Sequence, residues 1–549
     1  MQRPFAGLTW RNAGSEIVAG VTLLAIAVPL NIGYAQIAGL PPTAGLYALV
    51  VPAIVYAVLV SSRQLVASPD AAAAALVASS IGGLAVAGSN DYLTMAFAQA
   101  ILCGALFALA AVFKLGFLAN FLSKPILVGF VGGLALDILV SQLGKMLGVK
   151  IDPGGEFAEK VAGLLTGLPT ANGWSVVISS AAVVVLLGGR RLARAVPWAL
   201  VVLIVATLVV VAAGLEARGV SVLGPVEAGP PSLTWPVLSW RTWLALVPSA
   251  IALTMVTMAE GLLVARSYGE KRGYGTSPNR DLLAFGAANA AAGATGGFTI
   301  GASTSRTAAM DQAGSRTQLP TVVAAAGTLL LLLFGTALLE HIPSPAIGGI
   351  VGVAILPLLG IRDFRRLWRQ DRFEFAVGAA CFLGTLFIGA IPGIVIALVL
   401  ALINLAKRAS SPAIDVLAAD GEPGASLLGA APAGTATAPG VVVIRMAAPL
   451  FFANGSVFAD AVKRAVTETP HLHHVVIDLE AVTDVDVTGA EAFAALKNWL
   501  AAQHLALAYS RPRPQIVDRM HALGLIADEA IYPTNRAALS ALAPPLPGN

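Results

Sequence analysis

The sequence predicts an all-α membrane protein that carries a small α/β domain at its C-terminal end. Of its 549 residues, 57% are hydrophobic and only 12% are charged, and the mean hydropathy is +0.80. Soluble domains carry about 25% charged residues, so this composition indicates an integral membrane protein. The second observation is a change of pattern at Val441, where long apolar runs give way to alternating strand and helix patterns.

About fourteen apolar segments precede residue 410, several of them short or broken, whereas a spanning helix needs about 20 apolar residues. They begin near residues 17, 44, 68, 93, 122, 173, 196, 243, 281, 303, 319, 345, 373 and 391. With the N-terminus in the cytoplasm, the arginine clusters at Arg266–Arg280 and Arg362–Arg372 fall on the cytoplasmic side. The predicted outer turns hold no lysine or arginine at residues 36–43, 88–92 and 294–300. The outer turn at 144–172, with three lysines, is the exception. Both termini are therefore predicted to be cytoplasmic.

The polar stretch Gly297–Gln318, GFTIGASTSRTAAMDQAGSRTQ, interrupts the apolar segments around it. At membrane depth its backbone must be hidden from lipid, and it would then line a cavity. We expect Phe298–Ala302 to be extended. A half-helix would follow and open near Ser303, Thr304 and Ser305, whose hydroxyls suit an N-cap. The free N–H groups and the positive dipole end of such a helix favour an anion. The alternative is an ordinary loop on either side of the membrane.

A second broken stretch, Ser61–Ala75, reads SSRQLVASPDAAAAA. We expect Gln64–Ala67 to be extended and a half-helix to begin around Ser68, Pro69 and Asp70, because proline suits the first helical turn. Two interrupted segments in corresponding halves of a chain indicate a transporter site at a repeat interface. Two half-helix N-termini that meet at mid-membrane would hold an anionic substrate.

Four ordered motifs carry a resemblance that covers nearly the whole chain. They are PLNIGYAQIAGLPPTAGLY (Pro29–Tyr47), SSRQLVASPDAA, STSRTAAMDQAGSRTQ and IPSPAIGGIVGVAIL (Ile342–Leu356). Together they resemble the SulP anion transporters, here a prokaryotic member. The resemblance implies seven-plus-seven inverted repeats that form a mobile core domain and a gate domain. It also implies a homodimer in the bacterial plasma (inner) membrane.

The C-terminal part resembles a STAS domain. Strand patterns such as VVVIRM and LALAYS alternate with amphipathic helices, as in small α/β domains. The family's signature turn is DVDVTG, Asp484–Gly489. Val487 stands where related soluble anti-sigma antagonists carry a phosphorylatable serine, and Thr488 is expected to be a helix N-cap. We predict a transmembrane domain over residues 1–408, a flexible linker over 409–440 and a STAS domain over 441–549. One possible role of the STAS domain is to bind a cytoplasmic regulatory partner.

The predicted substrate site combines both half-helices with the first segment. Its residues are Asn31, Tyr34, Ser68, Asp70, Ala71, Ser303, Thr304, Ser305 and Arg306. In the family, the matching Ser-Arg pair lies beside the anion, and a guanidinium fork suits carboxylate, sulfate or bicarbonate. Alternatively, Arg306 is a buried counter-charge for Glu260 or Asp70. For Asp70, capping of the half-helix is the first interpretation. Alternatively, its carboxylate competes with the substrate anion for the helix end, or serves as a second coupling site when it is protonated.

Glu260 lies in an apolar helix pattern, LTMVTMAEGLLVARSYG. A carboxylate at such a position marks an ion path or a proton relay by default, so Glu260 is the predicted site for H⁺ or Na⁺. In the family, an acidic residue on this segment faces the substrate cavity. Structural pairing of Glu260 with Arg306 is the alternative. Asp137 is another intramembrane carboxylate, and the sequence does not identify its partner.

The predicted function is secondary active transport of a small anion, coupled to H⁺ or Na⁺, by alternating access. Bicarbonate, sulfate, chloride and dicarboxylates all fit two helix dipoles and one arginine. No nucleophile elbow, nucleotide loop or zinc spacing is present, so we predict no enzyme activity, no cofactor, no metal site and no nucleic-acid partner. The alternatives are an anion exchanger or channel, a proton symporter for nucleobases, which a STAS domain argues against, and a membrane anion sensor that signals through the STAS domain.

Overall fold

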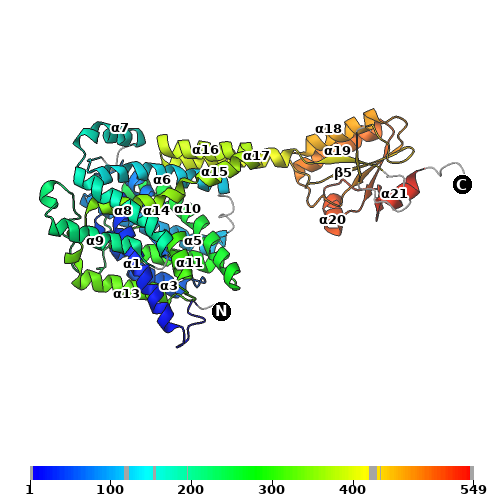
Figure 1. Ribbon diagram of the computed structural model, residues 1–549. Helices are drawn as coiled ribbons and strands as arrows, with labels where there is room; N and C mark the ends of the chain where they lie inside the picture. The colour runs from blue at the N-terminus through cyan, green and yellow to red at the C-terminus, as the bar shows by residue number, and fades with distance from the viewer. Residues whose placement is uncertain are drawn as a thin grey trace. The chain divides into compact units, whose positions relative to one another are not determined.

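A computed structural model describes residues 4–116, 123–151, 156–193, 196–418, 429–432 and 434–543. The chain divides into two compact units, residues 1–399 and 400–549. The first unit is helical and the second contains a mixed sheet, as Figure 1 shows. This confirms the predicted fold class of a helical membrane part followed by an α/β domain.

The first unit consists of helices and two very short strands (Figure 1). Its helices are α1 (Ala13–Ile37), α2 (Pro42–Tyr47), α3 (Val51–Leu59), α4 (Ala71–Ile81), α5 (Asn90–Val112), α6 (Lys124–Leu147), α7 (Phe157–Gly167), α8 (Gly173–Leu192), α9 (Trp198–Ala212), α10 (Trp240–Arg272), α11 (Pro278–Ala294), α12 (Thr304–Gln312), α13 (Leu319–Phe334), α14 (Ser344–Ile355), α15 (Ile361–Gln370) and α16 (Arg372–Phe387). Helix α17 (Ala390–Ser410) begins in the first unit and ends in the second. The strands are β1 (Ala67–Ser68) and β2 (Gly301–Ala302). Helix α1 packs against α13, and α11 packs against α5 and α3.

By length and composition, six helical stretches among the described residues are able to cross a membrane. A seventh is possible if α7 and α8, bent by 117°, form one span. Helices α4, α9 and α13 are apolar but shorter. The helices begin close to the positions expected from the sequence, but several are too short to cross a membrane by themselves. The number of about fourteen membrane segments therefore stays a prediction.

The two broken stretches meet at β1 and β2, which pair antiparallel with Ala67 opposite Ala302. The backbone just ahead of β2 is held by the buried side chain of Asn289 in α11. Its Nδ2 donates to the Ile300 carbonyl at 3.1 Å, and its Oδ1 accepts from the Ile300 N–H at 2.9 Å. The extended backbone of the two breaks is therefore hydrogen-bonded within the chain, as a hydrocarbon environment would require.

The extended pieces are shorter as strands than the sequence suggested. Gln64–Ala67 and Phe298–Ala302 were predicted, whereas ladder pairing covers two residues on each side. Beyond those residues one backbone bond remains, from the Ser303 N–H to the Val66 carbonyl at 2.9 Å, and side chains supply the others. The Val66 N–H donates to the Thr307 hydroxyl at 3.0 Å, and Asn289 binds Ile300.

The second unit is a six-stranded sheet with helices on both faces. Its strands are β3 (Ile414–Ala418), β4 (Gly429–Ala431), β5 (Val441–Met446), β6 (His474–Asp478), β7 (Ala506–Ser510) and β8 (Ala530–Tyr532). The order is β4-β3-β5-β6-β7-β8, with β5 to β8 parallel and β3 antiparallel to both neighbours. The helices are α18 (Gly455–Glu468), α19 (Val487–Ala502), α20 (Pro514–Ala522) and α21 (Asn535–Leu542). Phe458, Phe493 and Met520 bring α18, α19 and α20 onto one face, and Ala538 brings α21 onto the other.

Strands β3 and β4 lie within 409–440, the range predicted as a flexible linker. Val416 and Leu417 of β3 are buried, and β3 pairs along β5. Where these strands lie, the expectation of a flexible linker is wrong, because pairing satisfies the edge of β5 and buries apolar side chains that the Ala, Gly and Pro content had obscured. Residues 419–428 and 433 lie outside the described part of the chain.

The N-cap of α19 is Asp486 and not Thr488. One oxygen of its carboxylate accepts from the Gly489 N–H at 2.6 Å, and the other accepts from the Phe452 N–H at 2.9 Å. Aspartate is a strong N-cap, and two N–H donors converge on it here. Val487, the residue at the signature position, is 60% exposed.

We predict that Asn289→Ala destabilises the first unit. It leaves the buried N–H and carbonyl of Ile300 unpaired, at a cost of about 1–3 kcal/mol. Thermal unfolding in detergent should show a lower melting temperature than in Thr94→Ala, which removes only a hydroxyl bonded to its own helix at Asn90. Equal melting temperatures for the two variants would contradict this role of Asn289.

Candidate functional site

The N-termini of α4 and α12 lie next to each other because the strands directly ahead of them are paired. Asp70 caps α4, with its Oδ1 accepting from the Ala73 N–H at 2.7 Å. Ser303 caps α12, with its Oγ 3.4 Å from the Arg306 N–H. The first N–H groups of a helix have no partner within it and carry the positive end of its dipole. The capping role ranked first for Asp70 is thus confirmed.

Arg306 connects three segments of the first unit and is only 1% exposed. Its Nε donates to the Ser303 hydroxyl at 2.8 Å, its Nη1 to Asn31 Oδ1 at 3.0 Å, and its Nη2 to the Pro69 carbonyl. The guanidinium also lies 5.7 Å from the centre of the Tyr34 ring. A guanidinium has five N–H donors, so these three contacts leave others available.

Two further buried donors lie on the same segments. Asn31 and Ser68 are completely buried, and among the described residues Asn31 Nδ2 and Ser68 Oγ have no hydrogen-bond partner. An unpaired buried polar group costs about 1–3 kcal/mol, so such groups call for an explanation. They are groups from which a bound anion can accept. Ala71, the first residue of α4, is also buried.

Glu260, on α10, is hydrogen-bonded to the N-terminus of α12. The Thr304 hydroxyl donates to its Oε1 at 3.1 Å. Thr304 and Ser305 are exposed, unlike the buried Arg306 that follows them. In the described part of the chain, no ion pair within 4.0 Å joins Arg306 to Glu260 or Asp70. Glu260 is therefore bonded to the helix end itself rather than paired with Arg306.

Gly301 of β2 allows the Asp70 carboxylate to lie against the strand. A Cβ at position 301 would come within 2.1 Å of Asp70 Oδ2. The carboxylate therefore has one oxygen on its own helix end and the other against β2. Only a residue without a side chain fits this approach.

The sequence-predicted residues thus come together around the two helix ends, but three contributors were missed. The Pro69 carbonyl and Gly301 act through backbone geometry, and Asn289 acts through a side-chain amide that binds the backbone of Ile300. Asn289 left one trace in the sequence, an amide within a run of small apolar residues.

The partner of Asp137 is Lys160 of α7, whose Nζ lies 2.8 and 3.1 Å from the two carboxylate oxygens. The two residues lie 23 positions apart in the sequence, and no helical or strand spacing predicts a pair at that separation.

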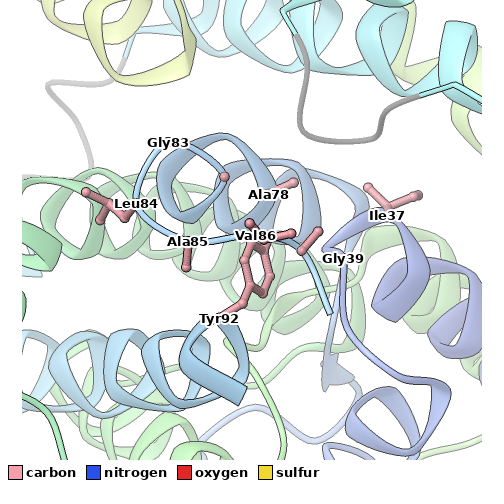
Figure 2. Close-up of a pocket in the computed structure, with 10 residues that line it drawn as sticks. Ile37, Gly39, Ala78, Gly83, Leu84, Ala85, Val86 and Tyr92 are labelled. Atoms are coloured by element: carbon pink, nitrogen blue, oxygen red, sulfur yellow. The ribbon is translucent and has the colours of Figure 1, made fainter. Parts of the chain in front are cut away.

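A cavity of about 380 Å³ lies elsewhere, at the other end of α4 (Figure 2). It is lined by residues 82–87 together with Ile37, Gly39, Ala78 and Tyr92, and none of the lining residues is charged. Figure 2 shows the Tyr92 ring next to Val86 and Ala85. At 1.5 Å per residue, the eleven residues of α4 place this cavity roughly 15 Å from Asp70, so the charged groups and the cavity are separate features.

The sequence profile of the sulfate permease family matches residues 14–381. The chain belongs to this family. A STAS domain profile matches residues 434–538, so the resemblance to SulP transporters with a STAS domain is confirmed. As a family member the protein is a transporter and not an enzyme, as the sequence predicted.

Curated relatives are similar over almost the whole chain. A probable sulfate transporter of Mycobacterium tuberculosis is 33% identical over 531 residues, covering 96% of this chain and 94% of the relative. Probable sulfate transporter 3.3 of Arabidopsis thaliana is 29% identical, covering 92% of this chain and 84% of the relative.

Solved structures agree with the fold. The murine solute carrier 26 family member A9 anion transporter in the inward-facing state matches with a TM-score of 0.88 at 20% identity, covering 97% of this chain and 92% of that one. The transmembrane domain of the cyanobacterial bicarbonate transporter BicA matches with a TM-score of 0.60 at 21% identity, covering 72% of this chain and 98% of that one. At this identity the likeness shows the fold alone.

We predict that Gly301→Ala destabilises this family member by about 1–3 kcal/mol, because the added methyl group overpacks the contact with Asp70. In the double variant Gly301→Ala/Asp70→Ala the carboxylate that causes the clash is gone. The loss of stability in the double variant should therefore be smaller than the sum of the losses in the two single variants. Melting temperatures of the four proteins in detergent complete this double-mutant cycle. Strict additivity would contradict a contact between Gly301 and the Asp70 carboxylate.

Proposed function

We propose that this protein is a secondary active transporter that binds a small anion between the N-termini of α4 and α12. The observation that carries the proposal is the pairing of two helix N-termini beside the buried cation Arg306. Helix ends of this kind bind anions through free N–H groups and the positive dipole. Asn31 Nδ2 and Ser68 Oγ, both buried and without a partner among the described residues, add two donors.

The relatives support the anion class. The curated relatives in M. tuberculosis and A. thaliana are named as probable sulfate transporters, and two similar structures are named as anion and bicarbonate transporters. Sulfate and bicarbonate are therefore the first anions to test, with chloride and dicarboxylates after them.

Glu260 is the proposed site for the coupling cation, either H⁺ or Na⁺. A carboxylate within a membrane helix is costly unless it has such a role. Its bond to Thr304 links its charge to the N-terminus of α12, where the anion is proposed to bind. A cation on Glu260 removes a negative charge from the anion's surroundings, so cation and anion promote each other's binding, and this coupling is reciprocal.

Alternating access would move the two broken segments as one body. The β1–β2 pairing and the contacts of Arg306 connect α1, α4 and α12, so these segments can shift together while the site stays intact. The distribution of arginines supports cytoplasmic termini. We further propose a homodimer in the bacterial inner membrane, with a regulatory partner at the STAS domain.

Glu260→Gln tests the coupling. In proteoliposomes loaded with either a proton or a sodium gradient, the wild type should concentrate labelled sulfate or bicarbonate with one gradient, and Glu260→Gln should lose the uphill component. Glu270→Gln is the matched control, since Glu270 lies on the same helix with its side chain 67% exposed and pairs only with Arg266 among the described residues. Equilibrative exchange that Glu260→Gln leaves unchanged would favour an exchanger.

Arg306→Gln tests the site itself. It removes the buried cation and two cross-segment contacts, and we expect uptake to fall about tenfold or more, equivalent to about 1.4 kcal/mol or more of lost interaction. Arg266→Gln, which breaks only an exposed pair with Glu270, should keep wild-type uptake. Gel filtration and melting temperature separate loss of function from loss of fold. If the folded wild type binds anions but moves none, the sensor hypothesis replaces transport.

A further inference from the structure

The two helix N-termini at the proposed site differ in charge. The α12 end is capped by the neutral hydroxyl of Ser303, and its next residues, Thr304 and Ser305, are exposed. The α4 end is capped by the carboxylate of Asp70, which accepts from the Ala73 N–H. The cap of the α4 end therefore brings a negative charge that belongs to the chain itself, whereas the cap of the α12 end is neutral.

This arrangement is built into the packing around Asp70. Gly301 leaves space for its Oδ2, so the carboxylate lies against β2 and does not turn away into a cavity. The titratable or charged groups that act on Asp70 are Arg306 on α12, Glu260 on α10 and Tyr34 on α1. No ion pair within 4.0 Å joins it to Arg306 among the described residues. When Asp70 is ionised, its charge is therefore part of the charge balance of the site.

The charges can be added up. Arg306 contributes one positive charge, and two helix N-termini contribute about +0.5 each. Asp70 and Glu260 together bring two negative charges, so the empty site is close to neutral when both are ionised. One cation at Glu260 leaves about one positive charge, which a monovalent anion balances. A divalent anion would leave an unpaired negative charge beside the half-buried carboxylate of Asp70, and like charges at such short range repel each other.

We propose that Asp70 sets the charge of the transported anion. With Asp70 ionised, the site takes a monovalent anion together with one cation at Glu260, and a divalent anion enters only when Asp70 is also protonated. This inference rests on the anion site proposed above. Hydrogen-bond donors do not make the same distinction, because Asn31, Ser68 and the α12 N–H groups can serve either kind of anion. Asp70 is thus a specificity-determining residue, and electrostatics rather than shape selects the substrate.

The test uses the full chain in proteoliposomes with labelled sulfate as the divalent anion and chloride, nitrate and bicarbonate as monovalent anions. Sulfate, chloride and nitrate keep their own charge from alkaline to mildly acidic pH, so a change in their ratio reports the protein. The wild type should favour monovalent anions at alkaline pH and gain sulfate uptake as the pH falls. Asp70→Ser, which keeps a capping hydroxyl but removes the charge, should raise sulfate relative to monovalent uptake about tenfold or more at alkaline pH.

Asp70→Asn is the second neutral variant, in case serine changes the helix end. Asp91→Asn is the matched control, because Asp91 is exposed in the first turn of α5 and its loss should leave the ratio unchanged. If a folded Asp70→Ser transports with the wild-type sulfate ratio and pH profile, the role of Asp70 is refuted while the transport proposal stands. A wild type that prefers sulfate at alkaline pH also refutes it. If the wild type moves no anion, the proposed function fails first, and this inference with it.

Discussion

The arrangement around β1 and β2 depends on hydrogen bonds to extended backbone that is buried. Chain that is neither helical nor paired is costly in a hydrocarbon environment. Here two breaks, more than two hundred residues apart in the chain, satisfy each other through the β1–β2 pairing. Asn289 and Thr307 bind the adjoining peptide groups with their side chains. The helix ends that follow each break are brought together as a consequence.

Arg306 has a structural role in this arrangement and a proposed role in anion binding. Its hydrogen bonds to Asn31, Ser303 and Pro69 hold the three segments in register, and its charge remains in a buried site. A buried cation that carries no ion pair within 4.0 Å in the described part of the chain would be an electrostatic burden in a purely structural role. In an anion site the same charge is useful, because its compensation arrives with the substrate. The structural role of Arg306 and its proposed role in anion binding therefore reinforce one another.

The carboxylates at the site give the two halves different tasks. Glu260 contacts the free helix end through Thr304, whereas Asp70 neutralises the other end and is accommodated by Gly301. A site with two equivalent helix ends would be more strongly positive and would suit more highly charged anions. Under our proposal, the capping residue Asp70 changes the charge of the preferred substrate without a change in the fold or in Arg306.

Much of the fold could be predicted from the sequence itself. Hydropathy and the two polar breaks predicted the membrane part, the half-helices and their caps at Asp70 and Ser303, because those signals are local and depend on neighbouring residues. The resemblance to the SulP family suggested a role for Ser305 and Arg306 in anion binding, which stays a proposal. The α/β domain was also predicted from its alternating pattern of strands and helices. The composition of residues 409–440 gave no sign of β3 and β4. The sequence analysis placed the N-cap of α19 at Thr488, two residues after the observed cap, Asp486.

Only the tertiary structure decided which groups pair with which. The contacts Arg306–Asn31, Glu260–Thr304 and Asp137–Lys160 join residues between 23 and 275 positions apart. No periodicity reports such distances, because they depend on how helices pack. The need for glycine at 301 likewise became visible only with Asp70 against it. The sequence by itself determined which residues carry charge and where helices begin. The packing determined which of those charges face one another, since electrostatic energy depends on separation in space and not along the chain.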